Sequence, residues 1–137
     1  FEAAGRITPR WEVFSGVALM RANIDAATGQ QANTLNNVPI NTPNYTMNLW
    51  TVYQLGRGWK VGGGFQGAGL RYANATNTVE VPAYIRWDGL IAYEQPRYTL
   101  RLNVFNIFDR DYYEGVYQGH TIPGVKRLFQ VTAELKF

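Results

Sequence analysis

The chain has no cysteine and a single histidine, His120, among its 137 residues. The lack of cysteine excludes a disulfide framework and thiolate metal sites, and one histidine offers no second imidazole for a metal centre. No apolar run reaches the length of a transmembrane helix. Charge is scarce as well, because 17% of the residues are charged, the net charge is +3, and lysine and arginine are spread along the chain. Nothing in this composition favours a nucleic-acid partner.

The last nine residues show most clearly what the chain does contain, since apolar and polar side chains alternate from residue 129 onward. Successive side chains of a strand point to opposite faces, so this segment is a strand with one apolar and one polar face. Such a strand is typical of a membrane β-barrel, in which lipid covers one face and a polar lumen the other. The apolar parity consists of Phe129, Val131, Ala133, Leu135 and Phe137, and the polar parity of Gln130, Thr132, Glu134 and Lys136.

Similar alternation upstream predicts an all-β chain with seven strands. Most of the segments have about ten residues or more, which is the length that a tilted strand needs to cross a bilayer. The predicted strands cover residues 2–8, 10–23, 45–55, 59–72, 83–94, 98–108 and 129–137.

The connections between these strands alternate in length. Short turns rich in glycine and proline follow every second strand, and long polar loops follow the others. This order predicts an antiparallel up-and-down meander with its tight turns on the periplasmic side and its long loops outside the cell. The short turns lie at residues 8–10, 56–58 and 95–97, and the long loops at 24–44, 74–82 and 109–125.

Aromatic residues on the apolar parity gather near the short-turn ends, where a periplasmic-side aromatic girdle would lie. An odd count of seven does not suit a finished barrel, because bacterial single-chain barrels have an even number of strands. Two unpaired sheet edges in hydrocarbon would also be costly. We therefore expect residues 1–137 to be part of a larger barrel. The aromatic residues concerned are Trp11, Tyr53, Trp59, Tyr93, Tyr98 and Phe137.

Several motifs resemble those of one family, the TonB-dependent outer-membrane receptors. Residues 102–113, LNVFNIFDRDYY, are similar to the penultimate strand of these receptors and its NLFDxxYY signature, with Ile107 in the leucine position. Residues 123–127, PGVKR, and the strand that ends at Phe137 are similar to their closing segment. Three further motifs look like strands of siderophore-type members and most resemble those of the catecholate subclass, namely NTPN at 41–44, LWT at 49–51 and GLRYAN at 69–74.

The resemblance implies a bacterial outer-membrane protein with a 22-strand barrel and a plugged lumen, which imports a ferric siderophore with energy from TonB. The expected partners are the remaining barrel strands, the plug, the siderophore, the TonB complex, outer-membrane lipid and the barrel assembly machinery, for which Phe137 resembles the assembly signal. Residues 1–137 contain no plug, so we expect them not to transport alone. Iron would arrive already chelated, so no cofactor and no protein metal ligand is expected.

Candidate ligand-binding residues lie in the loop at 109–125, where aromatic rings could stack on a siderophore and His120 could meet its negative charge. The alternative for residues 109–113 is structural, namely that they end the strand and set the exit of the loop. These candidates are Tyr112, Tyr113, Tyr117 and His120.

On the polar parity, four charged residues are expected to face the lumen, where they either hold the plug or simply line water: Lys60, Arg86, Asp88 and Arg101. The sequence contains no nucleophile and base at a catalytic spacing and no phosphate-binding loop, so it does not suggest an enzyme. Two alternatives remain open at this point, a small complete membrane barrel that acts as adhesin or anchor, and a soluble all-β ligand carrier.

Overall fold

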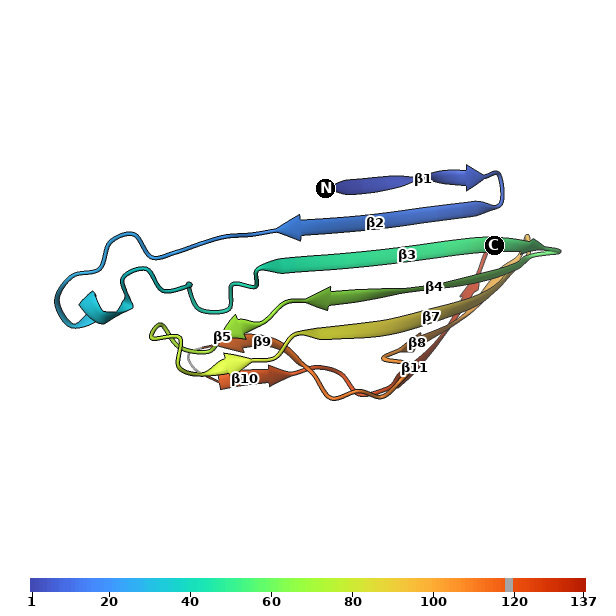
Figure 1. The fold of residues 1–137 in the computed structure, drawn as a ribbon. Helices are drawn as coiled ribbons and strands as arrows, with labels where there is room; N and C mark the ends of the chain where they lie inside the picture. Colours follow the sequence, from blue (N-terminus) through green and yellow to red (C-terminus); the bar gives the residue numbers. More distant parts are fainter. Residues whose placement is uncertain (118–119) are drawn as a thin grey trace.

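The computed structural model of the chain describes residues 1–117 and 120–137, without the side chains of residues 30–32 and Tyr117. Seven long strands form one antiparallel sheet in the order β1-β2-β3-β4-β7-β8-β11 (Figure 1). The predicted meander of seven strands is therefore confirmed. Its strands are β1 (Glu2–Thr8), β2 (Trp11–Leu19), β3 (Tyr45–Gly56), β4 (Trp59–Ala68), β7 (Tyr84–Glu94), β8 (Tyr98–Phe105) and β11 (Leu128–Leu135).

The three long loops gather at one end of the sheet and the tight turns at the other, as Figure 1 shows. The sequence predicted these loops without secondary structure, whereas the structure contains a short helical turn and two small hairpins at this end of the sheet. The predicted strand 59–72 is too long, because β4 ends at Ala68 and Arg71–Tyr72 belong to a separate hairpin, and the predicted strand 10–23 is too long because β2 ends at Leu19. Strands of two to five residues are too short to show a pattern of alternation. The added elements are the 3₁₀ helix η1 (Gly29–Thr34), the hairpin β5 (Arg71–Tyr72) with β6 (Glu80–Val81), and the hairpin β9 (Tyr113–Tyr117) with β10 (His120–Pro123).

The register places one apolar row across six neighbouring strands. Because side chains alternate with a period of two, a slip of one residue anywhere would have moved a strand's apolar set to the other face. No such slip interrupts the row, so the apolar parity read from the sequence forms one face of the sheet and the polar parity the other. The row runs through Trp11, Tyr53, Val61, Ile91, Leu102 and Val131.

The turn between β3 and β4 shows why two strands can be joined so tightly. Arg57 and Gly58 both have positive φ angles, 53° and 86°, as a two-residue hairpin turn of the primed type requires. A Cβ atom on Gly58 would overlap the carbonyl oxygen of Glu94, so only glycine fits. Beside this turn, the rings of Trp59 and Tyr93 have centroids 4.7 Å apart. Both residues belong to the predicted aromatic girdle.

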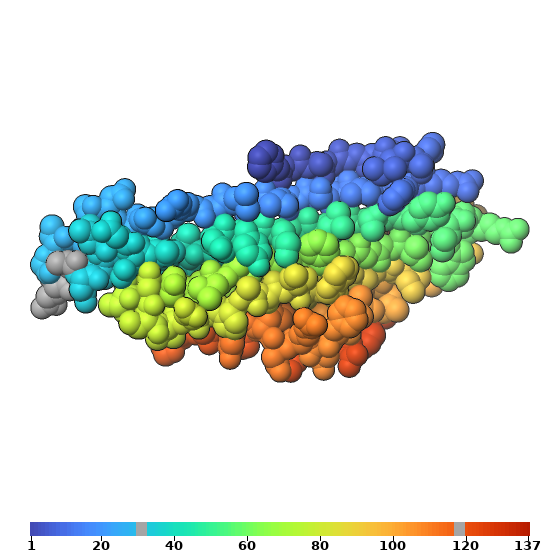
Figure 2. Space-filling view, in the orientation of Figure 1, coloured from blue at the N-terminus to red at the C-terminus, as the bar shows by residue number. Residues whose placement is uncertain are grey.

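The sheet bends across its strands like a section of barrel wall (Figure 1), and β1, β2, β3, β4 and β7 follow one another in Figure 2 as bands coloured from dark blue to yellow. Its two edge strands, β1 and β11, do not pair with each other within the described residues. The wall is thus open, as the odd strand count predicted, and a small closed barrel is not what these residues form. Among the described residues, no helix has the length and apolar character needed to cross a membrane.

Candidate functional site

An ion pair on the polar face of β7 connects the sheet to the loop that follows β8. Arg86 and Asp88 are two residues apart, so their side chains leave the strand on the same face. Arg86 donates to Oδ2 of Asp88 from Nε at 3.1 Å and from Nη2 at 2.7 Å. Its Nη1 donates to the hydroxyl oxygen of Tyr112 at 3.1 Å. Both side chains of the ion pair are only 12% exposed, so the pair is held in the wall rather than free in water.

The other carboxylate oxygen of Asp88 accepts a hydrogen bond from the backbone N–H of Asn106 at 2.9 Å. Asn106 is 1% exposed, and its φ of 50° ends β8 earlier than the predicted residue 108. Its Nδ2 donates to the carbonyls of Arg110 at 2.8 Å and Val125 at 2.9 Å, and its Oδ1 accepts from the N–H of Arg110 at 3.0 Å. One side chain thus satisfies three backbone groups from both ends of the loop.

Asp109 provides a second connection between the two ends of this loop. Its Oδ1 accepts a hydrogen bond from the backbone N–H of Arg127 at 2.8 Å, and its own N–H donates to the carbonyl of Asn106 at 2.8 Å. The hydrogen bond from Arg127 holds the pKa of the Asp109 carboxyl below its usual value, and the positive charges of Arg127 and Lys126 act in the same direction. The motifs at 106–109 and 123–127 therefore form one unit.

Tyr112 is buried between β7 and the closing end of the loop. Its ring stacks on that of Tyr84, with centroids 4.7 Å apart and an interplanar angle of 29°, and the residue is 7% exposed. A Cβ atom on Gly124 would overlap the Tyr112 ring. The glycine of the PGVKR motif is therefore required because the tyrosine ring lies directly on its backbone.

Arg71 joins the loops above the stacked tyrosines. Its guanidinium lies 5.6 Å from the centre of the Tyr84 ring, a distance typical of a cation–π contact. It donates to the carbonyl of Tyr113 at 2.6 Å and to that of Glu114 at 2.8 Å, both on β9, and to Oδ1 of Asn41 at 3.4 Å. The residue is 4% exposed. One buried cation thus connects three loops that are far apart in the sequence.

We expect Arg71→Met in the full-length receptor to loosen the β9–β10 hairpin without unfolding the sheet. Charged hydrogen bonds contribute about 1.5–3 kcal/mol each, so losing the bonds to Tyr113 and Glu114 should speed amide exchange in β9 by about tenfold or more. Hydrogen exchange read by mass spectrometry measures this directly. Arg101→Met is the matched control, because Arg101 is exposed and makes no side-chain hydrogen bond or ion pair within the described residues. Equal exchange in wild type and Arg71→Met would contradict the assignment.

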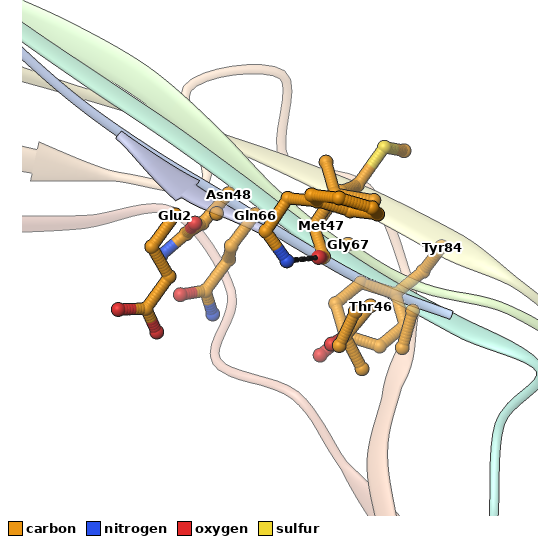
Figure 3. Close-up of a pocket in the computed structure, with 12 residues that line it drawn as sticks. Glu2, Thr46, Met47, Asn48, Gln66, Gly67 and Tyr84 are labelled. Atoms are coloured by element: carbon orange, nitrogen blue, oxygen red, sulfur yellow. Dashed lines mark hydrogen bonds between the residues drawn. The ribbon is translucent and has the colours of Figure 1, made fainter. Parts of the chain in front are cut away.

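A hollow of about 390 Å³ lies on the polar face beside this cluster, over β1, β2, β3, β4 and β7. Figure 3 shows Glu2, Gln66 and Tyr84 on the same side of the sheet, while Met47 points to the other side. Apolar side chains and glycine make up more than half of its lining, and the polar side chains are amides and hydroxyls apart from the carboxylate of Glu2, so the hollow can donate and accept hydrogen bonds. Its polar lining consists of Glu2, Thr46, Asn48, Gln66 and Tyr84.

Comparison with known proteins identifies the family. The model of the family "TonB dependent receptor-like, beta-barrel" matches residues 1–107. The chain belongs to the TonB-dependent receptor β-barrel family. It is 32% identical to the catecholate siderophore receptor Fiu of Escherichia coli K12 over 98% of this chain and 18% of that protein. It is 30% identical to the ferrioxamine receptor of Yersinia enterocolitica over 99% of this chain and 20% of that protein.

Solved structures of TonB-dependent receptors share the fold. The siderophore receptor PiuA from Acinetobacter baumannii superposes with a TM-score of 0.85 at 24% identity, covering 96% of this chain and 20% of that one. The closed form of the ferric-catecholate import receptor Fiu from Escherichia coli K12 superposes with a TM-score of 0.82 at 28% identity, covering 99% and 20%. The chain thus spans about a fifth of the length of these receptors. It is a segment of outer-membrane barrel wall, with its apolar row toward lipid.

Within this wall, the structure brings together only some of the predicted site residues. Arg86, Asp88 and Tyr112 are in contact, as described above. Lys60 instead pairs with Glu94 at 2.7 Å near the tight turns. Arg101 lies exposed on the same polar face and has no partner among the described residues. Whether any of them holds a plug remains a prediction.

The predicted ligand residues occupy different environments. Tyr112 is buried in the wall, which favours the structural alternative for residues 109–113. Tyr113 is 40% exposed, and His120 is exposed at the start of β10, paired through its backbone with Tyr117. The side chain of Tyr117 lies outside the described residues.

Sequence reasoning missed Arg71, Tyr84 and the role of Asn106. Arg71 and Asn106 lie inside the motifs at 69–74 and 102–113, but motif matching does not show which backbone groups they bind. Among residues 1–117 and 120–137, no group of three or more histidine, aspartate or glutamate side chains could hold a metal ion.

Proposed function

We propose that these residues form the C-terminal barrel wall of a TonB-dependent receptor that imports ferric siderophores of the catecholate class across the outer membrane. The observation that carries the proposal is the 32% identity over 98% of this chain to the catecholate siderophore receptor Fiu. The open edges β1 and β11 support a longer protein, since both need further strands in hydrocarbon.

The polar face fits contact with a plug in the lumen. The hollow beside Tyr84 offers amide and hydroxyl groups to a plug backbone, and Lys60, Arg86, Asp88 and Arg101 lie on the same face. In this proposal the plug and the TonB complex supply the gating and the energy, the barrel assembly machinery inserts the protein, and the wall contributes no catalysis. Iron enters as a finished chelate, so the wall needs no cofactor of its own.

Growth under iron limitation tests the substrate class. A strain without its own siderophore receptors would carry the full-length receptor and receive either a ferric catecholate or ferrioxamine as its only iron source. We expect growth on the catecholate alone. Growth on ferrioxamine alone would instead favour the activity named for the Yersinia enterocolitica relative, and growth on neither would contradict the proposal.

The β9–β10 hairpin is the proposed ligand contact, because it carries Tyr113, Tyr117 and His120 at the loop end of the wall. We expect Tyr117→Ala in the full-length receptor to weaken siderophore binding about threefold to tenfold, since a lost stacking partner is worth about 0.5–1.5 kcal/mol. Titration of the ferric complex measures this, and thermal unfolding should remain unchanged.

The control for this substitution is Val79→Ala, which truncates a half-exposed side chain on the neighbouring loop. Unchanged affinity in Tyr117→Ala and in His120→Ala would reduce the hairpin to a structural connector.

A further inference from the structure

A groove of about 380 Å³ opens on the lipid-facing side of the wall, close to the tight turns. Trp11, Tyr53 and Val61, which belong to the apolar row, form its sides, and its floor includes Gly63. The indole N–H of Trp11 is already satisfied, because Nε1 donates to Oγ1 of Thr51 at 2.6 Å. The Thr51 hydroxyl in turn donates to the carbonyl of Glu12 at 3.1 Å. The groove therefore presents an apolar surface to its surroundings.

Arginine side chains without an ionic partner among the described residues lie at the tight turns next to this groove. Arg10 immediately precedes Trp11, and Arg57 lies at the tip of the turn between the two strands that carry Tyr53 and Val61. Both are exposed, and neither side chain has a hydrogen bond or ion pair within the described residues. The turn between β7 and β8 carries a third such residue, Arg97. A basic residue thus occupies every tight turn.

The acidic residues nearest the turns on β2 and β7 do not neutralise these arginines, because each is paired with another cation. Glu12 is bound by Arg6, with Nε and Oε1 2.9 Å apart. Glu94 is bound by Lys60 on the polar face at 2.7 Å. The turns therefore present uncompensated positive charge next to an apolar groove.

We infer that this groove, with Arg10 and Arg57, is a binding site for an anionic phospholipid of the periplasmic leaflet. One acyl chain lies in the groove between Trp11, Tyr53 and Val61, and the guanidinium groups bind the phosphate of the headgroup, for which arginine geometry is well suited. The face is already a lipid interface, so the occupant is a lipid rather than a protein. The tight turns lie on the periplasmic side of outer-membrane barrels, so the occupant is a phospholipid and not the lipopolysaccharide of the outer leaflet.

Native mass spectrometry of the full-length receptor with phosphatidylglycerol or phosphatidylethanolamine of identical acyl chains tests the charge requirement. We expect wild type to prefer phosphatidylglycerol, and each of Arg10→Gln and Arg57→Asn to weaken its binding about fivefold, as expected for one basic side chain at an anionic lipid surface. Asparagine is chosen at residue 57 because it tolerates the positive φ there. Arg21→Gln removes the same charge just beyond the opposite end of β2 and should leave the preference unchanged.

Filling the groove tests the acyl-chain contact separately. A Cβ atom on Gly63 meets only the carbonyl oxygen of Asp88, at 3.4 Å, so Gly63→Leu places a side chain in the groove without displacing backbone. We expect it to lower the amount of both lipids retained. Gly5→Leu is the matched control, since Gly5 lies across the strands in the same register row, where a Cβ atom meets nothing within 4 Å.

Two results would overturn the inference. One is equal retention of the two lipids by wild type, which would indicate an unspecific lipid belt. The other is unchanged phosphatidylglycerol binding in the double variant Arg10→Gln and Arg57→Asn. Siderophore binding enters neither measurement, so a failure here and a failure of the proposed transport function are distinguishable.

Discussion

Asn106→Leu should destabilise the barrel wall more than any other single side-chain replacement in the 102–127 region. Leucine has a similar volume but cannot bind the N–H of Arg110 or the carbonyls of Arg110 and Val125, which Asn106 satisfies at 2.8–3.0 Å. Leaving three partly buried backbone groups without this partner costs about 3 kcal/mol in the free energy of unfolding, at the lower end of about 1–3 kcal/mol for each group. The positive φ of 50° adds to the cost, because asparagine adopts that conformation more readily than leucine.

Thermal or urea unfolding of the purified full-length receptor measures this effect. Asn103→Leu is the matched control, because Asn103 lies three residues earlier, on β8, is only half-buried and makes no side-chain hydrogen bond within the described residues. Asn106→Asp should be intermediate, since it keeps the acceptor for Arg110 N–H and loses both donated bonds. Unfolding of Asn106→Leu at the wild-type temperature would show that the loop does not depend on this side chain.

Replacement of Phe137 by aspartate, or its deletion, should reduce the amount of folded receptor in the outer membrane several-fold. Phe137 follows β11 and is fully exposed, so it contributes little packing within the described residues. Because this aromatic residue resembles the family's assembly signal, we expect the substitution to impair insertion into the outer membrane rather than the stability of the folded protein. A charge in the interfacial girdle is also unfavourable, though only by about 0–1 kcal/mol near the interface.

Heat-modifiable migration on gels, together with immunoblots of outer-membrane fractions, separates insertion from stability. Phe137→Tyr keeps the aromatic ring and should behave as wild type. After refolding in detergent, wild type and Phe137→Asp should unfold at nearly the same temperature, because the substitution removes little packing among the described residues. Normal amounts of folded Phe137→Asp protein in the outer membrane would contradict a role of Phe137 in assembly.

Much of the fold could be predicted because a strand in a barrel wall repeats every two residues. The alternation at 45–55 and 83–94 predicts β3 (Tyr45–Gly56) and β7 (Tyr84–Glu94) to within one residue. The predicted end of the sixth strand at 108 is three residues too late, since β8 ends at Phe105. Apolar Ile107 and Phe108 continue the local pattern, but the positive φ of Asn106 turns the chain before them.

The candidate site could be predicted only in part. The sequence places Arg86 and Asp88 on one face, because they are two residues apart on a strand, and that proximity produces their ion pair. It does not indicate that Tyr112 completes the cluster, since the hydrogen bond from Arg86 spans 26 residues. The small hairpins β5–β6 and β9–β10 were missed for a related reason, as they depend on contacts between loops.

By itself, the sequence determined the strand count, the two faces, the alternation of turns and loops, and the resemblance to TonB-dependent receptors. These features depend on local periodicity or on motifs, and neither requires knowledge of the chain's path. Only the tertiary structure decided that Arg71 binds the carbonyls of Tyr113 and Glu114, 42 and 43 residues away. Backbone carbonyls carry no residue-specific signal, so a buried arginine that binds them can be located only once the loops have been brought together.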